Sequence, residues 1–259
     1  MTTITAPASL LEPARPSLAR LSAVEIRKMV DTRSGRWMLI LIALTAVAMM
    51  PVILFAVPEE DQTLLEFFTA SQTGVSFLLP VIGILAVTSE WSQRTALTTF
   101  TLVPERPRVL VAKLFAGSAL GALFVAVGLV TAVISRGIGE VTGRSDGSWT
   151  LTPGRIGLTL LFAVLTLLMG AAFGMLFMNS PLAIVMFFVL PTLWTTLGEV
   201  VSKLKGAAGW LDTNRTLLAL SEPGTITGEE WARAGTSLLL WLVLPLVIGV
   251  IRLIRREVK

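Results

Sequence analysis

The stretch "WMLILIALTAVAMMPVILFAV", residues 37–57, contains no charged side chain. As an α-helix rising about 1.5 Å per residue, it would be roughly 30 Å long, which matches the hydrocarbon thickness of a bilayer. A helix also forms its backbone hydrogen bonds internally, as a chain surrounded by lipid must. The stretch therefore predicts a membrane-spanning helix.

Five further stretches have the same apolar character, and they lie at 67–87, 109–135, 156–178, 181–198 and 234–254. The whole composition agrees, since 15% of the residues are charged, whereas soluble domains average about 25%. We therefore predict an all-α integral membrane protein in which residues 37–259 form a six-span transmembrane domain.

The distribution of Lys and Arg predicts the orientation of these spans. With the N-terminus inside, the inner segments hold twice as many Lys and Arg residues as the outer ones. The loop "PEEDQTLLE", residues 58–66, has only acidic charges and then lies outside. By the positive-inside rule we expect both termini to be cytoplasmic, in a multi-pass protein of the inner (plasma) membrane.

The segment before the first span divides into two parts. Residues 1–16 are rich in Thr, Ala and Pro and predict a disordered tail. Residues 17–36 predict an amphipathic helix at the membrane interface, with the basic residues Arg27, Lys28 and Arg33. A solvated helix that leads into the first span is the alternative.

Small residues and a long polar segment mark the rest of the domain. Gly117 and Gly121, and likewise Gly170 and Gly174, have the GxxxG spacing that lets helices approach closely, which indicates packing between spans.

The extracellular segment 199–233 is too polar to span a membrane, and we expect short interfacial helices within it at 200–205 and 213–220.

The residue types exclude most enzyme chemistry. The chain has no Cys and no His, so it has no thiolate nucleophile, histidine base or usual transition-metal ligand set. It also has no Gly-Lys pair and hence no GxxxxGK[ST] phosphate loop, so any ATP and Mg²⁺ must bind to another polypeptide. The excess of positive charge indicates membrane orientation rather than nucleic-acid binding. We therefore predict no catalytic and no metal-binding residue in this chain.

The polar segment 88–108, "TSEWSQRTALTTFTLVPERPR", connects the second and third spans. Thr88 or Ser89 could cap a new cytoplasmic helix with Glu90 in its first turn, and Glu90 and Arg94 have the i,i+4 spacing of a helical ion pair. The prolines that follow would end this helix and turn the chain back, with Lys113 snorkelling at the start of the third span. The segment predicts a docking element for a cytoplasmic partner.

This order of residues resembles the permease subunits of type 2 ATP-binding-cassette (ABC) transporters. The resemblance rests on a Glu after the second span, a Thr five residues later and a Pro-Arg turn that leads to a Lys. Here these positions are Glu90, Thr95, Pro104, Arg106 or Arg108, and Lys113. Arg94 stands where members of the family often have Gly. The six spans, "EIRKMVDTRSGRWML" (25–39) and "WLVLPLVIGVIRLIRREVK" (241–259) extend the resemblance over nearly the whole chain from Ser17 onward.

The resemblance implies a half-transporter of an exporter. Two permease copies, most simply a homodimer, would enclose the pathway, and two cytoplasmic ATPase subunits with ATP and Mg²⁺ would drive it. The residues that would couple this chain to the ATPase are Glu90, Arg94, Thr95, Pro104, Arg106 and Arg108. The apolar spans would suit a hydrophobic or amphiphilic substrate such as a drug, a peptide or a lipid-like molecule.

Other functions stay open. A secondary transporter usually has ionisable residues deep in the membrane, whereas the six spans have none near their centres. A membrane enzyme would have few side chains with which to act. A non-transport scaffold or immunity protein that binds partners is compatible with the sequence.

Overall fold

The computed structural model describes residues 16–93, 101, 105–217 and 226–255. These residues are mostly helical and include no β-strand. Six of the helices are long and apolar enough to cross a membrane. The predicted all-helical class and its six membrane-length helices are thus confirmed, as expected for a multi-pass membrane protein. The predicted tail 1–16 lies outside the described residues, apart from Pro16.

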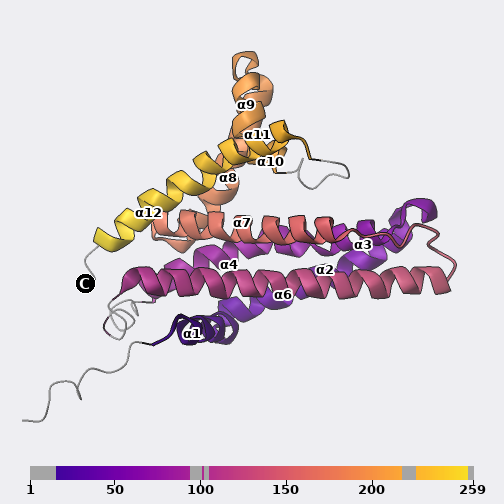
Figure 1. Cartoon of the computed structure of the whole chain (residues 1–259), viewed down its shortest axis with the longest axis horizontal. Helices are drawn as coiled ribbons and strands as arrows, with labels where there is room; N and C mark the ends of the chain where they lie inside the picture. Colours follow the sequence, from indigo (N-terminus) through magenta and orange to yellow (C-terminus); the bar gives the residue numbers. More distant parts are fainter. Residues whose placement is uncertain (1–15, 94–100, 102–104, 218–225, 256–259) are drawn as a thin grey trace, which may run out of the picture.

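Figure 1 shows the helices in chain order. The first part comprises α1 (Leu18–Asp31), α2 (Arg33–Ala56), α3 (Leu64–Ser71), α4 (Thr73–Ser92) and α6 (Arg106–Val141). The second part comprises α7 (Pro153–Phe177), α8 (Ser180–Val200), α9 (Lys205–Leu211), α10 (Thr213–Thr216), α11 (Gly228–Leu238) and α12 (Leu244–Arg255). Helices α3 and α4 together form the second span, while α11, the π-helical turn Leu239–Val243 and α12 form the sixth.

Residues 17–36 do not form the single helix that the sequence predicts. The Ser17 hydroxyl accepts the Arg20 N–H at the start of α1, and the extended residue Thr32 ends it. The Thr32 hydroxyl then accepts the Gly35 N–H and caps α2. Because a residue that caps a helix lies outside it, Thr32 separates two helices, and Arg33 is the first residue of the first span.

Several span ends also differ from the predicted ones. The third span begins at Arg106 and runs to Val141, beyond the expected end at Ser135, and the sixth begins at Gly228 rather than at residue 234. The helix expected at 200–205 is wrong, because the extended residue Val201 ends α8 and a short 3₁₀ turn leads to α9.

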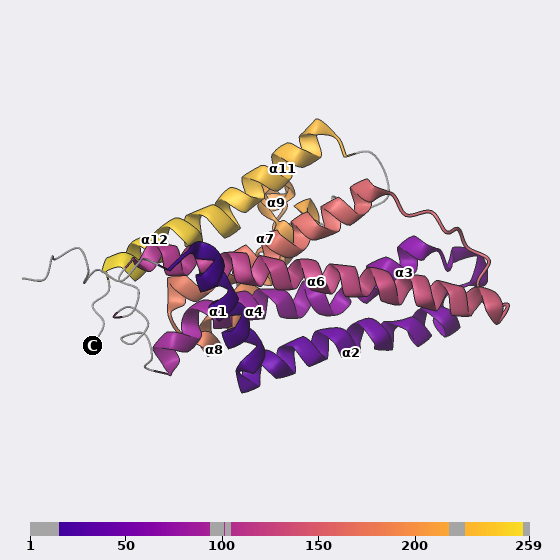
Figure 2. The same cartoon turned by 60° about the horizontal axis from the view of Figure 1, so that its bottom comes forward.

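Helices α4 and α7 pack against each other at the centre of the bundle. The most apolar part of the second span is 67% buried, whereas that of α8 is only 11% buried. Figures 1 and 2 show α4 among α2, α6 and α7, and Figure 1 shows α8 leading away from them toward α9. The structure thus has a packed core and one largely uncovered span.

The four glycines of the GxxxG pairs lie at contacts between helices of this core. A Cβ atom on Gly170 would collide with the Pro80 carbonyl of α4, and one on Gly174 would lie 3.0 Å from the Ile84 carbonyl oxygen. Gly117 faces the Leu167 side chain of α7, and Gly121 faces that of Leu79 in α4. The close approach of α4 and α7 therefore depends on glycine at position 170.

Candidate functional site

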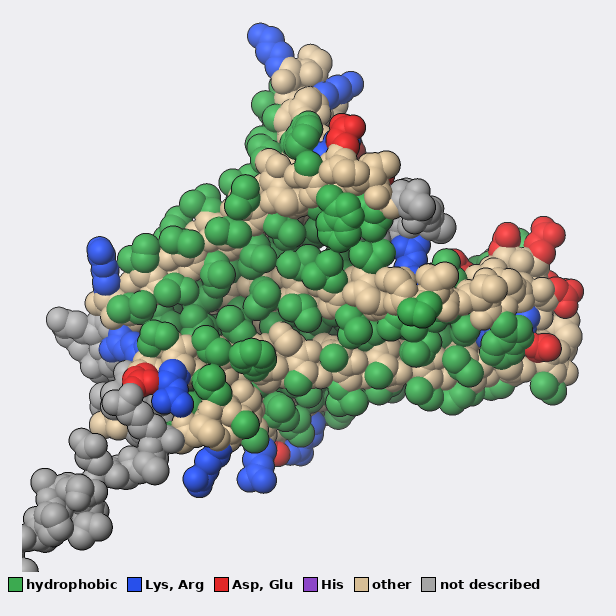
Figure 3. Space-filling view, in the orientation of Figure 1, with side chains coloured by type: hydrophobic (Ala, Val, Ile, Leu, Met, Phe, Trp, Pro, Cys, Tyr) green, Lys and Arg blue, Asp and Glu red, His purple; other side chains and the backbone are tan. Residues whose placement is uncertain are grey.

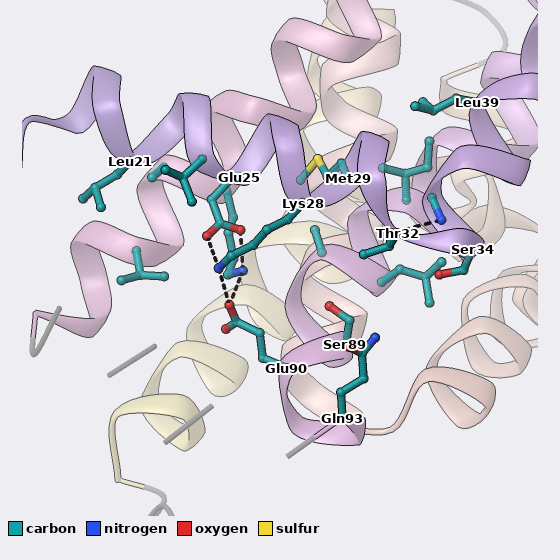
Figure 4. Close-up of a pocket in the computed structure, with 18 residues that line it drawn as sticks. Leu21, Glu25, Lys28, Met29, Thr32, Ser34, Leu39, Ser89, Glu90 and Gln93 are labelled. Atoms are coloured by element: carbon teal, nitrogen blue, oxygen red, sulfur yellow. Dashed lines mark hydrogen bonds and ion pairs between the residues drawn. The ribbon is translucent and has the colours of Figure 1, made fainter. Parts of the chain in front are cut away.

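Four charged side chains meet at the end of the bundle beside α1, and we call them the charge cluster. Glu25 and Lys28 come from α1, Glu90 from the last turn of α4, and Lys113 from near the start of α6 (Figure 4). The Lys113 ammonium lies 2.6 Å from Glu25 Oε2 and 3.0 Å from Glu90 Oε1. The Lys28 ammonium lies 2.7 Å from Glu25 Oε1 and 3.0 Å from Glu90 Oε1. The cluster therefore joins three helices through a closed set of ion pairs.

Three members of the charge cluster are buried and one is not. The side chains of Glu25, Glu90 and Lys113 are 7%, 8% and 6% exposed, while that of Lys28 is 42% exposed. Transfer of a charge out of water costs several kcal/mol unless opposite charges and hydrogen bonds compensate for it. The opposite charges on the neighbouring helices thus compensate for the burial of Glu25, Glu90 and Lys113.

The charge cluster keeps Lys28 protonated. Burial by itself lowers the pKa of Lys28, but the hydrogen bond to Glu25 and the negative charge of Glu90 outweigh it. The pKa of Lys28 therefore lies above the ordinary lysine value of 10.5. Its ammonium group is charged at any physiological pH.

A cavity of about 490 Å³ lies directly beside the charge cluster, between α1, α2, α4 and α6. All four cluster residues line it, together with Ser89 and Gln93, and Figure 4 shows Glu25, Lys28 and Glu90 close together in its wall. Apolar side chains line the rest, among them Leu39, Ile82 and Ala86. The cavity is therefore amphiphilic, with charges confined to one part of its wall.

The chain around Glu90 folds differently from the sequence prediction. No new helix is capped at Thr88 or Ser89, because α4 continues to Ser92. The Thr88 hydroxyl instead donates to the Ile84 carbonyl oxygen at 2.9 Å and shares a 2.7 Å hydrogen bond with Ser180. Glu90 consequently lies in the last turn of a span rather than in the first turn of a cytoplasmic helix.

Lys113 also differs from its prediction. The sequence predicts that it snorkels toward the headgroups, but its ammonium is buried between Glu25 and Glu90. The two carboxylates provide the solvation that snorkelling would have obtained from water. Sequence reasoning missed Glu25, although a lysine within an apolar run is a signal that could have found it, because a lysine that does not snorkel needs a buried counter-charge.

The remaining coupling residues are only partly described. Arg94, Thr95 and Pro104 lie outside the described residues. Arg106 donates to the Leu253 and Ile254 carbonyl oxygens at 2.8 and 3.2 Å, near the end of α12. Arg108 donates to Glu105 at 3.3 Å and to the Pro16 carbonyl oxygen at 2.8 Å. The start of α6 is therefore tied both to the last helix and to the chain that precedes α1.

Of the basic residues predicted for the interfacial helix, only Lys28 belongs to the charge cluster. Arg27 on α1 and Arg33 at the start of α2 are exposed. They lie at the same end of the bundle as the charge cluster and leave a basic surface there.

No protein-family model matches this chain, and no curated protein sequence matches it either.

Proposed function

We propose that this chain is the permease subunit of an ABC exporter. Two copies would form the translocation pathway in the inner membrane, and two separate cytoplasmic ATPase subunits would drive it. The substrate would be hydrophobic or amphiphilic. The observation that carries the proposal is the charge cluster, because it connects α1 to the two spans whose ends flank residues 94–104.

The charge cluster would make several helices respond together to a partner. The segment between Ser92 and Glu105 leaves α4 and enters α6, so a partner that moves this segment acts on both spans at once. The ion pairs of Glu90 and Lys113 with α1 would make the three helix ends move together. The Arg106 contact extends this connection to α12. An ATPase bound at this end would thus act on four helices through one short segment.

A secondary transporter agrees less well with the same contacts. Glu90 lies in the last turn of its span and Lys113 near the start of α6, and both are held in ion pairs. An ion-coupling residue should instead lie deep in the membrane and change partners during transport.

The complex itself provides the test. The tagged chain would be co-expressed with the ABC ATPase encoded nearest to it, extracted in mild detergent and weighed by native mass spectrometry. We expect two permeases with two ATPases, and ATPase activity that amphiphilic drugs stimulate. Arg108→Ala should lower that stimulation, while Lys205→Ala, which removes an exposed cation of the segment 199–233, should not. Recovery of the chain without any ATPase in several mild detergents would contradict the proposal.

The proposed orientation can be tested separately, because the chain contains no cysteine. A single cysteine would replace either Ala19 on α1 or Glu60 in the first loop, and both positions are exposed. In intact cells a membrane-impermeant maleimide should label Glu60→Cys at once and Ala19→Cys only after lysis. The opposite pattern would place α1 outside and exclude an ATPase partner at that end.

A further inference from the structure

We propose that the 490 Å³ cavity beside the charge cluster binds an anionic phospholipid from the leaflet that adjoins α1. The headgroup would lie at Lys28, and part of an acyl chain would fill the apolar end. This proposal goes beyond the transport function and does not depend on it, because it concerns binding to the isolated chain.

The size and the walls of the cavity suit part of an amphiphile. Its volume falls within the range of about 300–1,000 Å³ that is typical of sites for small molecules. Ile82, Leu85 and Ala86 of α4 form an apolar wall, and Leu39 of α2 faces the same space. Burial of an acyl chain against these side chains removes its apolar surface from water, which is favourable.

The place of the cavity in the bundle suits a lipid. Its wall contains Ser34 and Gly35 at the start of the first span, and Ser89 and Gln93 at the end of the second. Span ends lie near the headgroup region of a bilayer, where an amphiphile has its own boundary between polar and apolar parts. The charged end of the cavity and a lipid headgroup would therefore lie at the same depth.

The exposure of the cluster residues indicates which charge the bound headgroup should carry. The two carboxylates are nearly buried, at 7% and 8% exposed, whereas the Lys28 side chain is 42% exposed. An ammonium group has three N–H donors, and two of those of Lys28 are given to Glu25 and Glu90. The third can donate to a phosphate oxygen. The accessible charge of the cluster is thus positive, which favours an anion over a cation.

The surroundings reinforce this preference. Although the four charges of the cluster sum to zero, the exposed Arg27, Arg33 and Arg36 outnumber the exposed Asp31 on α1 and at the start of α2. Figure 3 shows Lys and Arg side chains gathered along this side of the molecule. Basic residues near a membrane surface attract anionic lipids at about 1 kcal/mol each. An anionic lipid would therefore be concentrated near the opening of the cavity.

Photo-crosslinking of the wild-type chain is the first test. Delipidated protein in detergent would be incubated with phosphatidylglycerol carrying a diazirine on its acyl chain, irradiated and mapped by mass spectrometry. We expect crosslinks at Leu39 and within residues 82–86, with labelling at least tenfold stronger than that by the matched phosphatidylcholine probe. Equal labelling by both probes, or crosslinks confined to lipid-facing surfaces such as α8, would overturn the proposal.

Four variants then separate the headgroup contact from the apolar wall. Lys28→Met should reduce phosphatidylglycerol labelling to the phosphatidylcholine level, while Lys28→Arg keeps the charge and should keep the preference. Arg20→Met removes an exposed cation of α1 that does not line the cavity, so it should leave the preference unchanged. Ala86→Phe fills the apolar end and should abolish labelling there by both probes. Labelling at the wild-type level in folded Lys28→Met or Ala86→Phe protein would overturn the proposal. If neither variant folds, the crosslinking map of the wild-type chain decides between the two outcomes given above.

Discussion

Two buried cations lie near the two ends of α6, and they are held in different ways. Lys113 and Arg136 are 6% and 3% exposed and, at about 1.5 Å per residue, lie roughly 35 Å apart along the helix. Lys113 binds carboxylates that are 88 and 23 residues away in sequence, on α1 and α4. Arg136 donates to the Gly147 carbonyl oxygen eleven residues later and to Glu140 four residues later.

The difference concerns what each cation stabilises. The chain after α6 folds back over Arg136, whose guanidinium lies 4.9 Å from the centre of the Trp149 ring. Ser145 binds the Gln62 carbonyl oxygen at 2.9 Å and so ties this loop to the one before α3. Arg136 thus stabilises a loop, whereas Lys113 holds separate helices together. The α1 end should therefore be the more sensitive to loss of its cation.

Lys113→Met should have the largest effect on stability. The variant takes the buried Lys113 ammonium away from Glu25 and Glu90, which stay buried and paired with the partly exposed Lys28. Loss of one member of a buried ion pair costs about 3–5 kcal/mol. Thermal unfolding of the variant and the wild type in the same detergent should show a loss of this size.

A double variant tests whether this loss comes from the carboxylates that remain. Without Lys113 the two carboxylates and Lys28 leave one excess negative charge, so adding Glu90→Gln to Lys113→Met removes that excess and should restore part of the stability. If the losses of the two single variants simply add in the double variant, the ion pairs contribute little to stability. Lys113 would then not hold the helices at the α1 end together in the way described above.

Gly170→Ala tests the centre of the bundle, between the two ends. Its Cβ would collide with the Pro80 backbone, which cannot move without shifting α4 against α7. We expect a loss of about 3 kcal/mol, at the upper end of the range for overpacking. Gly121→Ala is the control, because the nearest atom to its Cβ would be the flexible end of Leu79, at 3.1 Å. Equal losses for the two variants would show that the close approach of α4 and α7 is not rigid.

Arg136→Met should have a smaller and local effect. The variant removes the hydrogen bonds from the Arg136 guanidinium to the Gly147 carbonyl oxygen and the contact with the Trp149 ring. We expect the free energy of unfolding to fall by about 2 kcal/mol. Hydrogen exchange should become faster in residues 142–152 and stay unchanged in α1. Faster exchange in α1 would mean that the two ends are coupled along α6.

Lys28→Met should cost about 1 kcal/mol or less, since water screens the partly exposed ammonium. A raised pKa means that Lys28 stabilises the fold while it is protonated. The difference in unfolding free energy from the wild type should therefore be complete below pH 10.5 and disappear as the pH rises through the higher pKa of the folded state. A difference that does not depend on pH would show that Lys28 contributes through packing instead.

The sequence by itself determined that the chain is helical and has six membrane-length spans. Each span is a local property, because the length and the apolar character of one stretch decide whether it can cross a bilayer. The lone lysine in the third apolar stretch likewise indicated that a charge must be accommodated there. The prediction that the chain has no catalytic and no metal-binding residue likewise rests only on the residue types that are present.

Only the tertiary structure decided which partners the charges have and where the spans end. The sequence predicted that the third span ends at residue 135, yet α6 continues to Val141 because the Gly147 carbonyl satisfies the guanidinium of Arg136. Sequence reasoning assigned no role to Glu25, yet it is 5% exposed and bound to Lys113. No local pattern predicts contacts over 88 residues of chain, because the packing of α1 against α6 creates them.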